Sequence, residues 1–330
     1  MADLSTGYLG MTLRNPIIVG SSGLTNSVAK VKELEANGAG AVVLKSVFEE
    51  EIAAEFEDVL KEAMAKGYHQ EAFDYYDYQI RGDTLERYTE LIAQSKKSVS
   101  IPVIASVNCM YSHEWAMFAR ELQAAGADAL ELNMFFLPAD LSRTGAEQET
   151  AYFDVIARVK REVKLPIALK MSYHFSNLSL MIQRLSATGI GGLVLFNRFH
   201  TPDIDIEGMR VVPSNVFSTP AELGTSLRWI AMMAGRVESD LVASTGIHDG
   251  KAVIKQILAG AKAVEVVSTL YKNGPGHIRT MLEELDGWMT RHGHYGLEEF
   301  RGKMSQAKAE NPAVYERAQF MRYAGGGPAA

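Results

Sequence analysis

The segment Ala125-Gly126-Ala127-Asp128-Ala129-Leu130-Glu131-Leu132-Asn133 contains a glycine, an apolar run and a polar end, in that order. A glycine is common where a helix ends, because the residue after the helix often has a positive φ. The short apolar run that follows is typical of a parallel strand that is covered on both faces. The same arrangement recurs at residues 36–46, 187–197 and 259–269, so it predicts four strands of one kind.

A second kind of strand begins with proline. Asn15-Pro16-Ile17-Ile18-Val19, Ile101-Pro102-Val103-Ile104-Ala105 and Leu165-Pro166-Ile167-Ala168-Leu169 share this pattern. Proline is tolerated at the first residue of a strand, where no hydrogen bond of the sheet is lost. Leu241-Val242-Ala243 adds a strand without the proline. The two kinds alternate along the chain and together predict eight strands.

Amphipathic stretches between the strands complete the pattern, at residues 115–124, 152–163, 178–186 and 251–258. Eight strands that alternate with helices predict an α/β fold, the (β/α)8 TIM barrel. We expect an inserted segment after the second strand, within 47–98, and extra C-terminal helices within 278–323. Residues 1–323 would form a single barrel domain, and the glycine-rich residues 324–330 a disordered tail. A doubly wound open sheet is the alternative, but no GxGxxG motif opens the chain.

The composition narrows the classes of function. The net charge of −7 argues against a nucleic-acid partner, which needs a basic surface. The single cysteine, Cys109, excludes an intramolecular disulfide and a cysteine-based zinc or iron–sulfur centre within this chain, and no metal site is predicted. The N-terminal residues lack the pattern of a signal peptide, and no apolar run approaches the roughly 20 residues of a membrane span. We therefore expect a cytoplasmic protein without membrane contact.

Polar residues stand where the predicted strands end, which is where barrels of this kind carry their chemistry. Each residue alone could be a strand-end cap or a solvated side chain, but two lysines and three amides in one ring predict a ligand site. The strand ends supply Ser21, Ser22 and Gly23; Lys45 and Ser46; Asn108 and Cys109; Asn133; Lys170; Asn197; Ser244, Thr245 and Gly246; and Ser268 and Thr269.

The last two strands point to a phosphate group. Loops after strands seven and eight form the usual phosphate site of this fold, where backbone N–H groups face the anion. Gly246 would let the backbone approach closely, and Ser268 and Thr269 would add hydroxyl donors. The alternative interpretation is that Ser268 and Thr269 only cap a helix.

In their order and spacing these segments resemble the dihydroorotate dehydrogenase family, chiefly its class 1 members. The resemblance covers most of the chain and is weakest at 47–98. It rests on residues 15–23, 40–46, 128–133, 165–170, 196–197, 244–250, 257–261, 288–289 and 299–302.

The resemblance implies that FMN passes a hydride through its N5 atom and that the substrate is small, planar and anionic. The family oxidises the CH–CH bond of dihydroorotate to give orotate, a step of pyrimidine biosynthesis, and its barrels commonly form homodimers. Lys170 would stabilise negative charge at the N1–C2 edge of the flavin. Lys45 would contact the flavin or a substrate carboxylate, and Asn133 and Asn197 would hold the substrate. The residues expected to bind FMN are Gly20, Ser21, Ser22, Lys45, Ser46, Asn133, Lys170, Thr245, Gly246, Val267, Ser268 and Thr269.

The sequence departs from the family pattern at the residues that bind orotate. Phe136 stands where the family has a cysteine or serine base, and phenylalanine cannot abstract a proton. The Asn-x-x-Gly-x-x-Asn loop is not visible after strand two, where Asp74-Tyr75-Tyr76-Asp77-Tyr78 occurs instead, and Arg198 follows Asn197 in place of a hydroxyl residue. The other candidate bases are Cys109, His174, His200 and Asp140.

Several functions therefore stay open. A flavoprotein of the same fold could act on a different substrate with Arg198 or a histidine. A non-catalytic FMN-binding subunit or regulator is a second alternative, and a flavin-free barrel that acts on a sugar phosphate is a third. A tRNA-modifying flavoenzyme is disfavoured by the acidic balance. Fumarate, NAD through a partner, and oxygen all remain open as electron acceptors.

Overall fold

A closed barrel of eight parallel strands forms the centre of the molecule. The computed structural model describes residues 2–48, 73–108, 114–199, 201–214 and 216–316. Strands pair with their neighbours in chain order, and β13 pairs with β3 while β4 pairs with β6, which closes the ring. The predicted (β/α)8 fold is confirmed. The barrel strands are β3 (Ile17–Val19), β4 (Ala41–Val43), β6 (Val103–Asn108), β7 (Ala129–Met134), β8 (Ile167–Met171), β9 (Gly192–Leu195), β12 (Asp240–Ser244) and β13 (Ala263–Val266).

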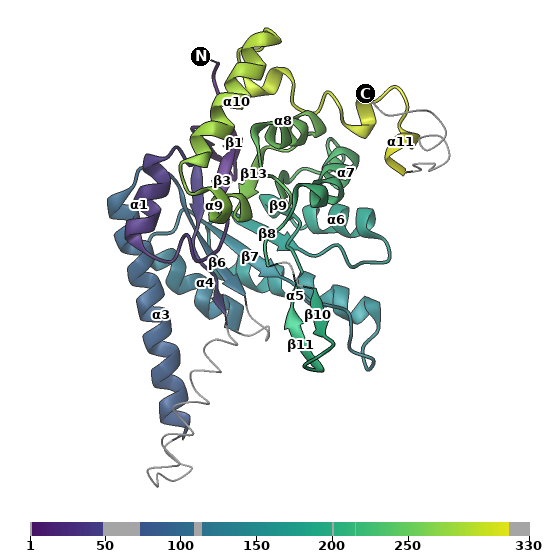
Figure 1. Ribbon diagram of the computed structural model, residues 1–330. Coiled ribbons are helices and arrows are strands. Elements are labelled where there is room, and N and C mark those ends of the chain that lie inside the picture. Colours follow the sequence, from purple (N-terminus) through teal and green to yellow (C-terminus); the bar gives the residue numbers. More distant parts are fainter. Residues whose placement is uncertain (1, 49–72, 109–113, 200, 215, 317–330) are drawn as a thin grey trace.

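Helices surround the barrel (Figure 1). Gly126 and Gly260, which follow α4 and α8, have φ values of +95° and +125°, the positive region that the repeat predicted. The helices are α1 (Val28–Ala36), α3 (Phe73–Ser98), α4 (Glu114–Ala124), α5 (Gly145–Glu162), α6 (Leu178–Ser186), α7 (Leu223–Met233), α8 (Gly250–Ala259), α9 (Ser268–Asn273), α10 (His277–Arg291) and α11 (Ala313–Glu316), with short 3-10 turns η2 (Pro220–Glu222), η3 (Leu297–Glu299) and η4 (Gln306–Lys308).

Two hairpins were not predicted. β1 (Thr6–Tyr8) and β2 (Met11–Leu13) form the first, and β10 (Pro202–Asp205) and β11 (Arg210–Pro213) form the second, in the loop after β9. The turn of the first hairpin covers the N-terminal end of the barrel, where the Leu9 N–H donates to Asp240 Oδ2 at 2.9 Å. This hairpin fills the end of the barrel opposite to the one where parallel strands carry their chemistry.

The barrel interior is layered because successive residues of a strand face opposite sides. Ile104, Ala129, Ala168 and Ala263 belong to an inner apolar cluster. Two residues further along the same strands lie Ser106, Glu131, Lys170 and Glu265, all buried. A polar layer therefore lies directly below the C-terminal mouth.

The insertion after strand two lies partly outside the described residues. Its described parts are β5 (Val47–Phe48), which pairs with β6, and the long helix α3, which projects away from the barrel (Figure 1). The residues predicted as a tail, 324–330, are also outside the described part. Among the described residues, no helix is both long and apolar enough to cross a membrane.

Candidate active site at the barrel mouth

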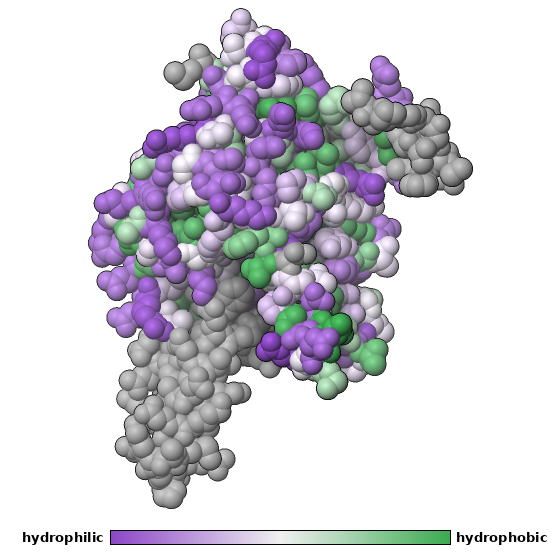
Figure 2. Space-filling model, in the orientation of Figure 1, coloured by the Kyte–Doolittle hydropathy of each residue, from purple (hydrophilic) through white to green (hydrophobic). Residues whose placement is uncertain are grey.

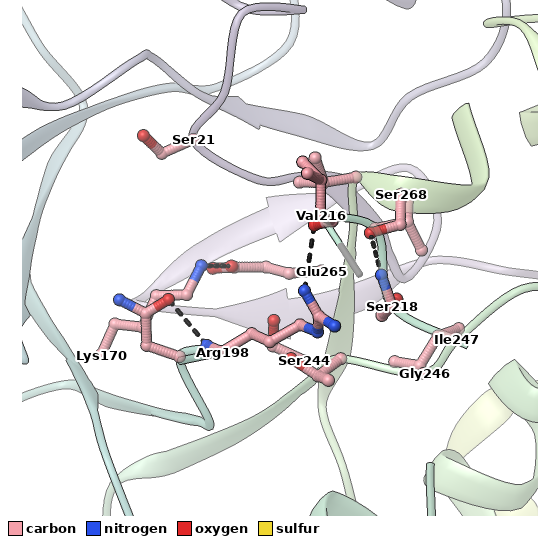
Figure 3. Close-up of a pocket in the computed structure, with 14 residues that line it drawn as sticks. Ser21, Lys170, Arg198, Val216, Ser218, Ser244, Gly246, Ile247, Glu265 and Ser268 are labelled. Atoms are coloured by element: carbon pink, nitrogen blue, oxygen red, sulfur yellow. Dashed lines mark hydrogen bonds and ion pairs between the residues drawn. The ribbon is translucent and has the colours of Figure 1, made fainter. Parts of the chain in front are cut away.

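A cavity of about 160 Å³ opens at the carboxyl ends of the strands. Polar side chains from several strands point into it, including Lys170 and Glu265 (Figure 3). The remaining lining residues come from β3, from the loop after β9 and from the ends of β12 and β13: Ser21, Asn197, Arg198, Val216, Ser218, Ser244, Thr245, Gly246, Ile247, Val266, Val267 and Ser268.

The loop after β12 has an unusual backbone. Thr245 and Gly246 have φ values of +75° and +80°, in the region that favours glycine. A Cβ on Gly246 would lie 2.2 Å from the Leu223 nitrogen at the start of α7. Only glycine lets the loop pass this close to α7 while it lines the cavity.

The segment around Ser218 covers the same end of the cavity. The Ser218 N–H donates to Ser268 Oγ at 3.0 Å, and Lys272 Nζ donates to the Ser218 carbonyl at 2.8 Å. Ser218 Oγ lies 3.1 Å from His248 Nε2. Burial and the nearby Lys272 lower the pKa of His248, so this imidazole is neutral at neutral pH. Lys272 therefore supplies the positive charge on this side.

The centre of the mouth holds an ion pair. Lys170 Nζ lies 2.5 Å from Glu265 Oε2 and 3.8 Å from Glu131 Oε1. Burial lowers the pKa of Lys170, but the two acids more than offset this effect, and the pKa is raised. Burial and then the neighbouring Glu265 raise the pKa of Glu131 well above its ordinary value. These shifts favour a charged Lys170 and a protonated Glu131.

The two predicted amides lie together. Asn197 Nδ2 donates to Asn133 Oδ1 at 2.6 Å, and Asn197 Oδ1 accepts from the Arg198 N–H at 2.9 Å. The Arg198 side chain turns toward the loop after β9, where its Nε pairs with Glu222 Oε2 at 2.7 Å and its Nη1 donates to the Val216 carbonyl at 2.9 Å. Burial opposes ionisation of Glu222, but hydrogen bonds from Arg198 and the Thr219 N–H hold its pKa below the ordinary value.

A chain of hydroxyls connects the first three barrel strands. Ser21 Oγ lies 3.0 Å from Ser46 Oγ, which lies 2.7 Å from Ser106 Oγ. Gly20 allows close approach to β13, since a Cβ there would lie 3.1 Å from both Glu265 Oε2 and Val267 Cγ2. Lys45 follows β4 and is half-buried next to Ser46.

Some predicted FMN contacts lie beside the cavity but do not line it. Thr269 is fully buried and its hydroxyl donates to the His248 carbonyl at 3.1 Å. The Ser22 hydroxyl donates to the Gly20 carbonyl at 3.2 Å. Both residues support the loops around the cavity in this structure, and their contact with a cofactor stays a prediction.

The candidate bases do not form one site in the described residues. Phe136 packs edge-on against Tyr152, with 5.6 Å between ring centroids. His174 lies among aromatic rings, stacked on Tyr173 at 4.6 Å, and within the described chain its buried Nδ1 has no hydrogen-bond partner. Asp140 is exposed, and hydrogen bonds from Ser142 lower its pKa. Cys109 and His200 lie outside the described residues.

A second cavity, of about 400 Å³, adjoins the first beside the loop after β9. Tyr173, Phe196 and Phe199 line one part of it, and Phe135 stacks on Phe199 with 3.8 Å between ring centroids. Hydroxyl groups line another part, from Thr201, Ser214, Thr219, Thr225 and Ser226. This mouth is therefore more aromatic than the predicted ring of amides suggested.

Glu131 and Glu265 are the site residues that sequence reasoning missed. Each stands inside an apolar strand, in Leu130-Glu131-Leu132 and Val264-Glu265-Val266. Charged residues are almost never fully buried unless they are paired, so a glutamate within such a strand is a usable signal. Lys170, on the strand β8 that neighbours β7, is the partner of both acids.

Fold and site define an α/β barrel with a hydrogen-bonding cavity at the carboxyl ends of its strands. A family model described as dihydroorotate dehydrogenase matches residues 3–289. The chain therefore belongs to the dihydroorotate dehydrogenase family, whose members are oxidoreductases.

Several curated relatives align along nearly the whole chain. The dihydroorotate dehydrogenase B (NAD(+)), catalytic subunit, of Thermoplasma volcanium is 27% identical over 314 residues, 92% of this chain and 98% of the relative. The protein of the same name from Thermoplasma acidophilum is 25% identical, covering 92% and 99%. That from Methanocaldococcus jannaschii is 23% identical, covering 91% and 97%. The identities are those of a divergent member.

Proposed function

We propose that this protein is an FMN-dependent oxidoreductase that acts on a CH–CH bond of a small planar substrate. Family membership supports the reaction class, and the cavity between the ends of β12 and β13 supports the cofactor. The single observation that carries the proposal is the approach of Gly246 to α7, since a Cβ there would lie 2.2 Å from the Leu223 nitrogen beside the cavity. The glycine lets the loop pack against α7 and keep its backbone at the cavity, where backbone N–H groups would face a phosphate group.

Residues of the mouth fit both the phosphate and the flavin ring of FMN. Gly246, Ile247 and Ser268 would hold the phosphate, with Lys272 as the nearby cation. Ser21 and Lys170 line the inner part of the cavity, where the flavin ring would lie. When bound, FMN would supply hydride acceptance at its N5 atom.

The substrate site would be built from the amides and the rings. Asn133 and Asn197 would orient a planar molecule, and the stacked rings of Phe135 and Phe199 would exclude water from it. Exclusion of water strengthens each hydrogen bond to the substrate. The side chain of Lys45 would attract an anionic substituent, whereas the guanidinium of Arg198 is already paired with Glu222.

Dihydroorotate itself is a poor fit because of Phe136. The ring at the position of the family base packs against Tyr152, and a phenylalanine side chain cannot accept a proton in place of the thiol or hydroxyl. This observation favours a second candidate function, in which an FMN-binding protein of the same fold takes a different substrate or has a regulatory role.

An absorption spectrum of the purified protein tests the cofactor, and anaerobic mixing with dihydroorotate tests the substrate. We expect a flavin spectrum that dihydroorotate bleaches at least 100-fold more slowly than a base-containing relative does. A colourless protein that takes up no added FMN would exclude the proposed function, and rapid bleaching would exclude the second candidate.

A further inference from the structure

Three ionisable side chains share the polar layer below the mouth. Glu131 from β7, Lys170 from β8 and Glu265 from β13 are 1%, 7% and 2% exposed. The Lys170 ammonium lies 2.5 Å from Glu265 and 3.8 Å from Glu131. One buried cation therefore faces two carboxyl groups, of which Glu265 is the close partner.

The charges of this cluster cancel. Two buried carboxylates beside one ammonium would leave an uncompensated negative charge, which is costly away from water. Glu131 escapes this cost by holding a proton, in line with its raised pKa. Tyr8 and Tyr88 also face the cluster, and burial raises the pKa of both hydroxyls, so neither adds a charge. Asp240 interacts with Tyr8 from the N-terminal end of the barrel.

The cluster borders the cavity. Lys170 and Glu265 both line it, and Figure 3 shows the two side chains directed toward each other at its inner wall. Within the described residues, Glu265 Oε1 and both carboxyl oxygens of Glu131 are buried. A hydrogen bond between the two carboxyl groups contributes to the raised pKa of Glu131, so the proton on Glu131 satisfies an oxygen of Glu265.

We propose that Glu265 is a positioning residue that cancels the charge of Lys170 and thereby keeps the reduction potential of bound FMN low. This inference rests on the proposed function. A hydride brings two electrons and one proton, so reduction leaves one added negative charge, which the flavin places at its N1–C2 edge. An unpaired ammonium would stabilise that charge strongly, whereas an ammonium already paired with a carboxylate stabilises it little.

The midpoint potential of the FMN-loaded protein tests the proposal. Glu265→Gln removes the charge that pairs with Lys170, and Glu131→Gln in the same chain prevents the second acid from ionising in its place. Without the two acids burial lowers the pKa of Lys170, so the potential is measured at a mildly acidic pH, where Lys170 keeps its proton. There we expect the double variant to favour reduced flavin at least tenfold more than the wild type, an upward shift of about 30 mV for a two-electron couple. Glu131→Gln alone is the matched control and should leave the potential unchanged, because that acid already carries a proton.

Sulfite binding gives a second measurement, on the wild type and on the same double variant. Its sulfur forms a bond to flavin N5, and the electron pair of that bond leaves the same negative charge at the N1–C2 edge. We expect the wild-type holoprotein to bind sulfite no more tightly than free FMN does, and the double variant to bind it at least tenfold more tightly than the wild type.

The contrary results distinguish a failure of the proposed function from a failure of the role of Glu265. Loss of FMN uptake by the wild type would contradict the proposed function itself. Normal uptake with equal potentials in the wild type and the double variant would contradict only the role of Glu265. Tight sulfite binding by the wild type would show that the charge of Lys170 stabilises negative charge on the flavin despite Glu265, and would also contradict the role of Glu265.

Discussion

The raised pKa of Glu131 should affect how the stability of the protein depends on pH. Its folded-state pKa is raised by burial and by Glu265, while in the unfolded chain it ionises near its ordinary value. When the pKa of an acid is higher in the folded than in the unfolded protein, the folded state loses stability as the pH rises above the unfolded pKa. The loss is about 1.4 kcal/mol per pH unit and ends when the folded pKa is reached. Glu131→Gln should therefore gain stability relative to the wild type between about pH 5 and about pH 7.5.

Urea unfolding at the two pH values measures this gain. Glu33→Gln, on the exposed surface of α1, is the matched control and should show no such change. A difference between Glu131→Gln and the wild type that is the same at both pH values would mean that Glu131 ionises in the folded protein.

Phe136 is the second residue with a sharp expectation. The ring is half-buried and packs against Tyr152. Phe136→Cys therefore removes packing, and we expect the surroundings of an aromatic ring not to stabilise the thiolate that a base requires. We expect it to lower the free energy of unfolding by about 1–3 kcal/mol and to give no oxidation of dihydroorotate. Phe136→Leu should lose less stability. Dihydroorotate turnover by the cysteine variant, measured anaerobically, would show that only the base was missing.

Residue roles were the part least accessible from the sequence. Lys170, Asn133 and Asn197 were predicted at the mouth because strand ends are easy to find. Glu265 was read as part of an apolar strand, because whether a strand residue faces inward or outward depends on the barrel's closure. The Phe135–Phe199 stack joins loops after β7 and β9, and no local pattern reports such a contact.

At the scale of elements, the loop after β12 decides whether a phosphate can bind. Gly246→Ala places a Cβ against the Leu223 nitrogen at a φ of +80°, so the loop must move. We expect FMN affinity to fall at least tenfold and stability to fall by about 1–3 kcal/mol. Gly224→Ala in α7, where a Cβ meets nothing within 4 Å, is the control and should retain FMN affinity. Equal FMN affinities of Gly246→Ala and the wild type in a fluorescence titration would show that the Gly246 loop does not contribute to FMN binding.

All eight barrel strands could be predicted, because seven begin after a helix-ending glycine or a proline and the eighth, β12, is a short apolar run at the expected place in the alternation. The helices were predicted less well at their ends: α5 begins before the predicted 152 because Thr144 and Glu147 form a capping box. That box is a sequence signal that periodicity alone does not use. Hairpin β10–β11 carries exposed apolar residues on both strands, so it lacks the alternation that reveals a half-buried strand.

At the scale of the whole molecule, the homodimer remains a prediction. The β10–β11 hairpin exposes Ile206 and Met209 by 79% and 88%, and Figure 2 shows apolar surface in this region. Exposed apolar patches mark interaction sites. If this hairpin forms the dimer contact, Ile206→Lys with Met209→Lys should weaken the dimer at least tenfold, while Glu207→Lys should not. Sedimentation measures this, and a monomeric wild type would contradict it.

We propose that the mouth of this barrel binds FMN through a phosphate site between β12 and β13. Titration of the flavin-free protein with FMN and with riboflavin, which lacks the phosphate, tests it most directly. We expect one FMN per chain, bound at least 100-fold more tightly than riboflavin. Equal affinity for the two flavins, or no binding of either, would contradict it.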